Sequence, residues 1–70
     1  MTPLLDVLSE REEAVLLMLA EDHGIREIAH QLGVSARTAR RDREQALAKL
    51  KVHTTTAAVA IVIRLRAGAA

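Results

Sequence analysis

Residues Ser35 to Leu50 read SARTARRDREQALAKL, and this stretch is predicted to form a helix that begins after a capping serine. A repeat of 3.6 residues places Ala46, Leu47 and Leu50 within about 80° of Ala39 on the helix surface. These side chains are predicted to pack on an apolar core. The other side of the helix carries arginines, and their placement needs a separate explanation.

Arg37, Arg40 and Arg41 lie in the first half of this helix, where the helix dipole disfavours cations. Phosphate groups would explain the placement, because arginine neutralises phosphate and can also bond bidentately to guanine in the major groove. The alternative is an arginine-rich face that is simply solvated. The wheel centres the outward face on Arg37, Arg41, Glu44 and Ala48, with Arg40 and Lys51 on its flank.

A second short helix is predicted just upstream, from Ile25 to Leu32, with Gly24 as its N-cap and Gly33 as its left-handed C-terminal residue. Ala29 is small where the two helices must approach closely. Two short helices joined by a tight turn that contains glycine are typical of a helix-turn-helix. Because the second helix of that motif enters the major groove, Ser35 to Leu50 is predicted to be a DNA recognition helix.

Ser9 followed by Glu12 is a capping-box pattern, which predicts a first helix over residues 10–22. Its core stripe comprises Leu8, Val15, Leu16 and Leu19, while Leu17 and Met18 are predicted to point away. Glu12 falls on the core stripe, where it either caps the helix or pairs with Arg43 or Lys49 of the third helix; the cap is favoured. Arg43 is predicted to pair with an acidic residue of the first helix. Asp42 and Glu44 are predicted to pair with neighbouring arginines.

A fourth helix is predicted over residues 55–66, with Thr54 as its cap. Its β-branched residues are also typical of a strand, but a lone strand in a helical chain would have no partner. Val59, Val62 and Ile63 share one face of this helix, and other apolar residues cover much of the rest. A helix that is apolar nearly all round buries both sides, so a two-fold dimer is expected. The predicted dimer interface comprises Ala57, Ala58, Ile61 and Leu65.

The composition fits one small all-α domain of 70 residues without cysteine or aromatic residues. We expect a lead-in at residues 1–8, with Leu4 and Leu5 lying back on the domain, a four-helix domain at 9–67 and a tail at 68–70. Residues 1–34 carry two arginines against seven acids, whereas residues 35–70 carry eight Lys or Arg against two acids. This asymmetry favours an oriented electrostatic surface.

Several function classes are disfavoured by the same sequence. The three histidines lack metal-ligand spacing, and no serine or lysine lies in a recognisable catalytic arrangement, so no metal, cofactor or enzymatic activity is expected. The absence of aromatic residues disfavours base stacking on single strands. The apolar run at residues 57–63 is too short to cross a bilayer, and no signal peptide is recognised, so a cytoplasmic location is expected.

The segments LSERE, EIAHQLGVS, TARR and KLKVH together resemble the LuxR/FixJ/NarL-type DNA-binding domain of bacterial transcription regulators, from Leu8 to about Leu65. The resemblance implies a four-helix helix-turn-helix domain that dimerises through its fourth helix. It implies base contacts by Arg40, Arg41 and Glu44, backbone contacts by Ser35, Arg37 and Thr38, and a structural role for Lys49. It also implies double-stranded DNA, a second copy of the chain and RNA polymerase as partners, and a role as a response-regulator output domain or a stand-alone regulator.

The chain departs from the family pattern at three positions. Ala39 replaces a larger aliphatic residue, which is expected to loosen the core. Gly24 replaces a capping hydroxyl, which is expected to weaken a phosphate contact. Asp42 replaces histidine and is expected to bring a negative charge near DNA. Two other functions stay open: a sigma-factor-like promoter-recognition domain, and a protein-interaction or dimerisation module that does not bind DNA.

Overall fold

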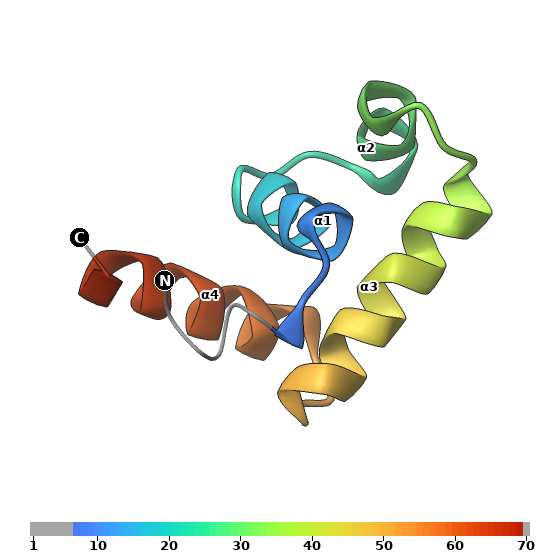
Figure 1. Cartoon of the computed structure of the whole chain (residues 1–70). Coiled ribbons are helices and arrows are strands. Elements are labelled where there is room, and N and C mark those ends of the chain that lie inside the picture. Colours follow the sequence, from blue (N-terminus) through green and yellow to red (C-terminus); the bar gives the residue numbers. More distant parts are fainter. Residues whose placement is uncertain (1–6, 70) are drawn as a thin grey trace.

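The computed structural model describes residues 7–69, which fold into four helices (Figure 1). In chain order these are α1 (Glu10–Ala20), α2 (Ile25–Leu32), α3 (Ala36–Leu50) and α4 (Thr55–Ala69). The central helix is α1, which packs against the other three helices, with α2 and α4 lying on opposite sides of it. The predicted all-α architecture is confirmed.

The bounds of α2 and α3 agree with the prediction, whereas α1 and α4 differ from it. The α1 helix ends two residues early because the chain turns back at Asp22, which has a φ of 69°. The amide of His23 then donates to the Met18 carbonyl at 3.1 Å, which closes the turn. The α4 helix runs three residues beyond the predicted end, to Ala69.

Local capping explains where the helices begin. The Ser9 hydroxyl accepts from the Glu12 amide and the Glu12 carboxylate accepts from the Ser9 amide, so the predicted capping box is confirmed. The hydroxyl of Thr54 accepts from the Ala57 amide at 3.1 Å and caps α4. Gly24 begins α2 without any side-chain hydrogen bond, as expected for a glycine.

A left-handed glycine ends α2 and makes the tight turn into α3. Gly33 has a φ of 70°, and the amide of Val34 donates to the Ala29 carbonyl at 3.0 Å. This is the hydrogen-bond pattern of a Schellman motif, and only glycine adopts such a φ without a steric cost. The turn therefore sets the angle between α2 and α3.

The core is aliphatic and draws on all four helices. Its largest fully buried side chains are Leu16, Ile28, Val15 and Val62. Small side chains are buried on both α2 and α3, since Ala29 of α2 is 4% and Ala39 of α3 is 0% exposed. Apolar burial of this kind is the main stabilising contribution in so small a domain.

The predicted orientation of Leu17 is wrong, because this side chain is partly buried and packs against the core cluster. A central helix with neighbours on three sides buries more than one stripe, and a prediction of a single core face for α1 misses this. Leu8 is buried as predicted, at 7% exposure. Leu4 and Leu5 lie outside the described residues.

Candidate nucleic-acid interface

The candidate interface is the outward side of α3. Ser35 begins this helix by accepting a hydrogen bond from the Thr38 amide at 3.0 Å, and its hydroxyl also donates to Thr38 Oγ1 at 3.1 Å. The inward side packs through Ala39, Ala46 and Leu47, which are all buried. The opposite side is thereby exposed, and the predicted contact residues on it are Arg37, Arg40, Arg41 and Glu44, all exposed, with Ser35 exposed and Thr38 partly buried at its start.

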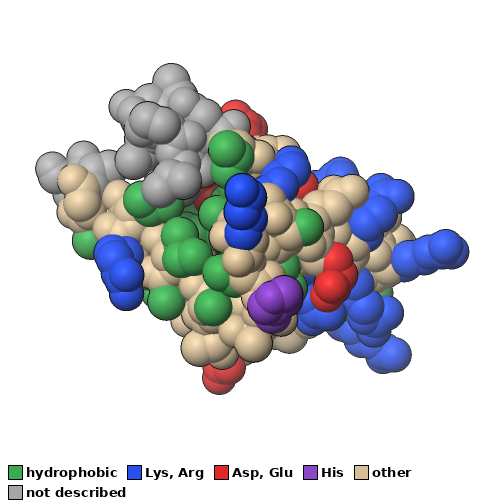
Figure 2. Space-filling model, turned by 90° about the horizontal axis from the view of Figure 1, so that it is seen from below, with side chains coloured by type: hydrophobic (Ala, Val, Ile, Leu, Met, Phe, Trp, Pro, Cys, Tyr) green, Lys and Arg blue, Asp and Glu red, His purple; other side chains and the backbone are tan. Residues whose placement is uncertain are grey.

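The arginines of this surface are not neutralised by neighbouring acids. Within residues 7–69, no ion pair involves Arg37, Arg40 or Arg41. Figure 2 shows Lys and Arg side chains gathered at the end of the molecule where α3 lies, while hydrophobic side chains gather toward α4. The outward side of α3 therefore presents a concentrated positive charge, as anion recognition requires.

Arg43 does not pair with an acid of α1, so that prediction is wrong. Its Nη2 atom lies 3.4 Å from Oε1 of Glu44, the next residue along α3. Of the two α3 partners considered for Glu12 of α1, Arg43 and Lys49, it is Lys49 that bonds it, at 2.7 Å. Lys49 lies six residues, or about 1.7 turns, further along α3. It reaches α1 from the inward edge, which leaves Arg43 on the flank of the helix.

The predictions for Asp42 are also wrong, because its carboxylate points into the molecule and not toward the arginine surface. Asp42 is 2% exposed and does not pair with its neighbours in α3. Instead, Arg11 Nε of α1 lies 2.6 Å from Asp42 Oδ2, and Arg11 Nη2 donates to Oδ1 at 3.3 Å. The pair hides the only other acid of α3 besides Glu44, so the outer surface keeps its positive charge.

Glu12 performs both of the roles considered for it. Burial raises the pKa of its carboxyl, but hydrogen bonds from Lys49 Nζ and the Ser9 amide, together with the lysine charge, outweigh burial and hold the pKa below its ordinary value of 4.5. The carboxylate is therefore charged at neutral pH. It links the start of α1 to the inward side of α3.

Three consecutive residues of α1 thus each reach a different partner on another helix. Arg11 pairs with Asp42 and Glu12 with Lys49, both on α3, and Glu13 accepts from Arg66 Nη1 of α4 at 2.8 Å. Two of these three pairs were not predicted from the sequence. The only sequence signal for these pairs is that one basic and two acidic residues, Arg11, Glu12 and Glu13, follow one another in the first turn of α1.

The α4 helix buries one side, and its exposed side carries Ala60, Ile63 and Ala67 together with Arg64 and Arg66. Ala58 is 0% exposed and belongs to the core of its own chain, so its predicted place in a dimer interface is wrong. The other predicted interface residues, Ala57, Ile61 and Leu65, are partly buried. Ile63, which was predicted to share the core face with Val59 and Val62, is 51% exposed. The side chain that was missed for the outer surface is therefore Ile63.

Comparison with known proteins agrees with this arrangement. Residues 6–62 match the family model described as "Bacterial regulatory proteins, luxR family". The match covers most of the chain, and the chain belongs to this family. It is thus a helix-turn-helix domain of a DNA-binding family of transcription regulators, which is not a family of enzymes.

No curated protein matches the chain. Across residues 7–69, no single helix is long and apolar enough to cross a membrane.

Proposed function

We propose that this domain binds specific sequences of double-stranded DNA as part of a transcription regulator, with α3 in the major groove. The observation that carries the proposal is the row of exposed arginines on α3 that no acid of the described chain neutralises. In this arrangement Arg40, Arg41 and Glu44 contact base edges. Ser35, Arg37 and Thr38 contact the phosphate backbone.

Two copies of the chain would pair through the outer side of α4, and this pairing forms the homodimer that we propose. Ile61 and Leu65 lie on one flank of that side, where they are partly exposed, and Ile63 lies on the other flank and is half exposed. Pairing would cover this apolar surface and double the length of DNA that is read. Such a regulator acts in the cytoplasm, and RNA polymerase is the expected further partner once the domain is bound.

The test is binding to a pool of random duplexes over a series of salt concentrations. Each neutralised phosphate contributes a slope of about 0.9 to the dependence of log affinity on log salt, so affinity falls steeply as salt rises. Selection from the pool then yields a preferred sequence. Binding that does not change with salt contradicts the proposal.

Variants separate base reading from phosphate binding. Arg41→Ala is expected to weaken the free energy of binding to the selected sequence by about 1–3 kcal/mol and to reduce discrimination among sequences. Arg26→Gln removes the same charge from the exposed side of α2, outside the contacts proposed for α3 and α4, and serves as the matched control. Equal losses in both variants would show that only net charge matters, and would favour the alternative of a fold that does not read DNA.

A further inference from the structure

The last residue of the α3 region has a backbone conformation that its side chain disfavours. Lys51 follows the helix with φ 59° and ψ 43°, and its amide donates to the carbonyls of Leu47 and Ala48. This left-handed conformation crowds the Cβ atom of any residue other than glycine. At the end of α2 the same task falls to Gly33, with φ 70°. A lysine at the end of α3 therefore calls for an explanation beyond the turn itself.

Helix stability does not supply that explanation. A cation near a helix C-terminus interacts favourably with the dipole, but for an exposed side chain this gain is smaller than the steric cost of a left-handed backbone. Lys51 is exposed, and within residues 7–69 no ion pair involves it. Its charge is therefore free to meet an anion outside the chain.

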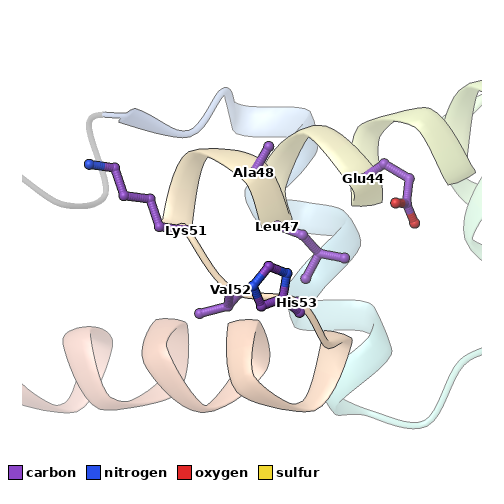
Figure 3. Close-up of a pocket in the computed structure, with 6 residues that line it drawn as sticks. All are labelled: Glu44, Leu47, Ala48, Lys51, Val52 and His53. Atoms are coloured by element: carbon purple, nitrogen blue, oxygen red, sulfur yellow. The ribbon is translucent and has the colours of Figure 1, made fainter.

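The position of Lys51 relates it to the arginine surface of α3. It follows Glu44 by seven residues, which places it about 10 Å further along the helix axis and about 20° around it. The two residues line one open hollow, together with Leu47, Ala48, Val52 and His53. Figure 3 shows Glu44 at one end of this hollow and Lys51 at the other, with the His53 ring between them.

These distances match the dimensions of duplex DNA. The major groove is about 12 Å wide, and phosphates line both of its edges. A helix that places Glu44 over base edges brings a residue about 10 Å further along its axis close to the groove edge. Lysine binds phosphate as a point charge and needs no fixed geometry, which suits an exposed side chain at a helix end.

We propose that the Lys51 ammonium binds a phosphate of duplex DNA at the edge of the groove that α3 occupies. The contact extends the interface beyond the predicted backbone residues, which all lie at the start of α3. It depends on the proposed function, since it requires α3 to lie in the groove. The unfavourable left-handed backbone at Lys51 is then the cost of placing its ammonium group at the edge of the groove.

The test uses Lys51→Gly, which removes the charge and relieves the backbone at once. The probe is a duplex selected from the random pool, and binding is measured over a salt series. Lys51→Gly is expected to keep or raise the melting temperature, to weaken binding about tenfold at low salt and to reduce the salt slope by about one per bound chain. Lys51→Arg keeps the charge and is expected to retain both affinity and slope.

The outcomes separate this inference from the proposed function. If Arg41→Ala weakens binding while Lys51→Gly leaves affinity and slope unchanged, the phosphate contact is wrong and the DNA-binding function stands. If the unaltered chain shows no salt-dependent binding, both are wrong. A fall in melting temperature for Lys51→Gly contradicts the argument from backbone cost. Lys51→Asn, which is uncharged and tolerates the left-handed region, then measures the charge effect alone, and an unchanged slope for it also overturns the inference.

Discussion

At the scale of single residues, the buried charges of this domain hold α3 in place. Asp42 lies among three arginines in the sequence, yet its carboxylate is buried and Arg11 of α1 reaches it. An ionised carboxylate without a partner at 2% exposure is strongly disfavoured. The guanidinium of Arg11 therefore supplies the partner that the buried Asp42 carboxylate needs, and the pair fixes which side of α3 faces inward.

Arg11→Met is expected to lower the free energy of unfolding by about 2 kcal/mol, because it leaves Asp42 buried without its partner. Removing one member of a fully buried pair costs about 3–5 kcal/mol, and the effect is smaller here because the Arg11 side chain is 46% exposed. Urea denaturation measures it. The matched control is Arg40→Met on the exposed surface, which should change stability by less than about 0.5 kcal/mol.

The double variant Arg11→Met, Asp42→Leu tests the mechanism. Replacing both charges with apolar groups removes the unpaired carboxylate, so most of the lost stability is expected to return. If the double variant is as unstable as the single one, packing by the Arg11 stem and not its charge is responsible.

Glu12→Gln is expected to lower stability at neutral pH by about 1 kcal/mol, since it weakens the hydrogen bond from Lys49. The pKa of Glu12 is lowered in the folded chain, so its stabilising contribution is complete above the ordinary value of 4.5 and is lost as the pH falls through the folded value. The stability difference between the two chains should therefore shrink on acidification below pH 4.5. A difference that stays constant with pH would contradict a charged Glu12.

At the scale of the elements, the sequence predicts best what is decided locally. Both ends of α2 and the start of α3 follow from Gly24, Gly33 and Ser35, each of which acts within four residues of itself. The partners of Arg43 and Asp42 were predicted wrongly because they depend on how α1 and α3 are rotated against each other. Rotation is set by packing along the whole contact between helices, which a helical wheel for one helix does not contain.

The turn between α2 and α3 depends on a single backbone conformation. Gly33→Ala is expected to destabilise the domain by about 1 kcal/mol, because alanine at φ 70° is strained although no atom lies within 4 Å of the added Cβ. Thermal unfolding measures the change. Gly68→Ala, inside α4 and equally free of contacts, is the control and should be neutral or stabilising. Equal effects at the two glycines would show that backbone conformation does not explain the cost.

At the scale of the whole molecule, the unpaired arginines of α3 and the half-exposed Ile63 of α4 lie on different helices. Figure 2 shows most Lys and Arg side chains of this face gathered at the end where α3 lies, while hydrophobic side chains gather toward α4. Ile63 of α4 is 51% exposed. The sequence predicted both surfaces from helical wheels, but it placed Ala58 outside and Ile63 inside. The error arises because α4 is apolar nearly all round, so its pattern alone does not show which side meets the core.

Placing an aspartate on the outer side of α4 tests whether this surface joins two copies. Ile63→Asp alters a side chain that is 51% exposed, so the fold should tolerate it. Sedimentation with the selected duplex is expected to give two chains per duplex for the unaltered domain and one for this variant. In a two-fold contact the two new carboxylates lie close to each other. Their loss of hydration and their mutual repulsion both oppose association.

Gln31→Asp on the exposed side of α2 adds the same charge away from α4 and should leave two chains on each duplex. Ile61→Asp, on the flank of the same outer side, should act in the same direction as Ile63→Asp. If both isoleucine variants still bind as pairs with unchanged affinity, the copies do not meet through α4. In that case the outer side of α4 does not bring two recognition helices together, and DNA alone holds the two copies.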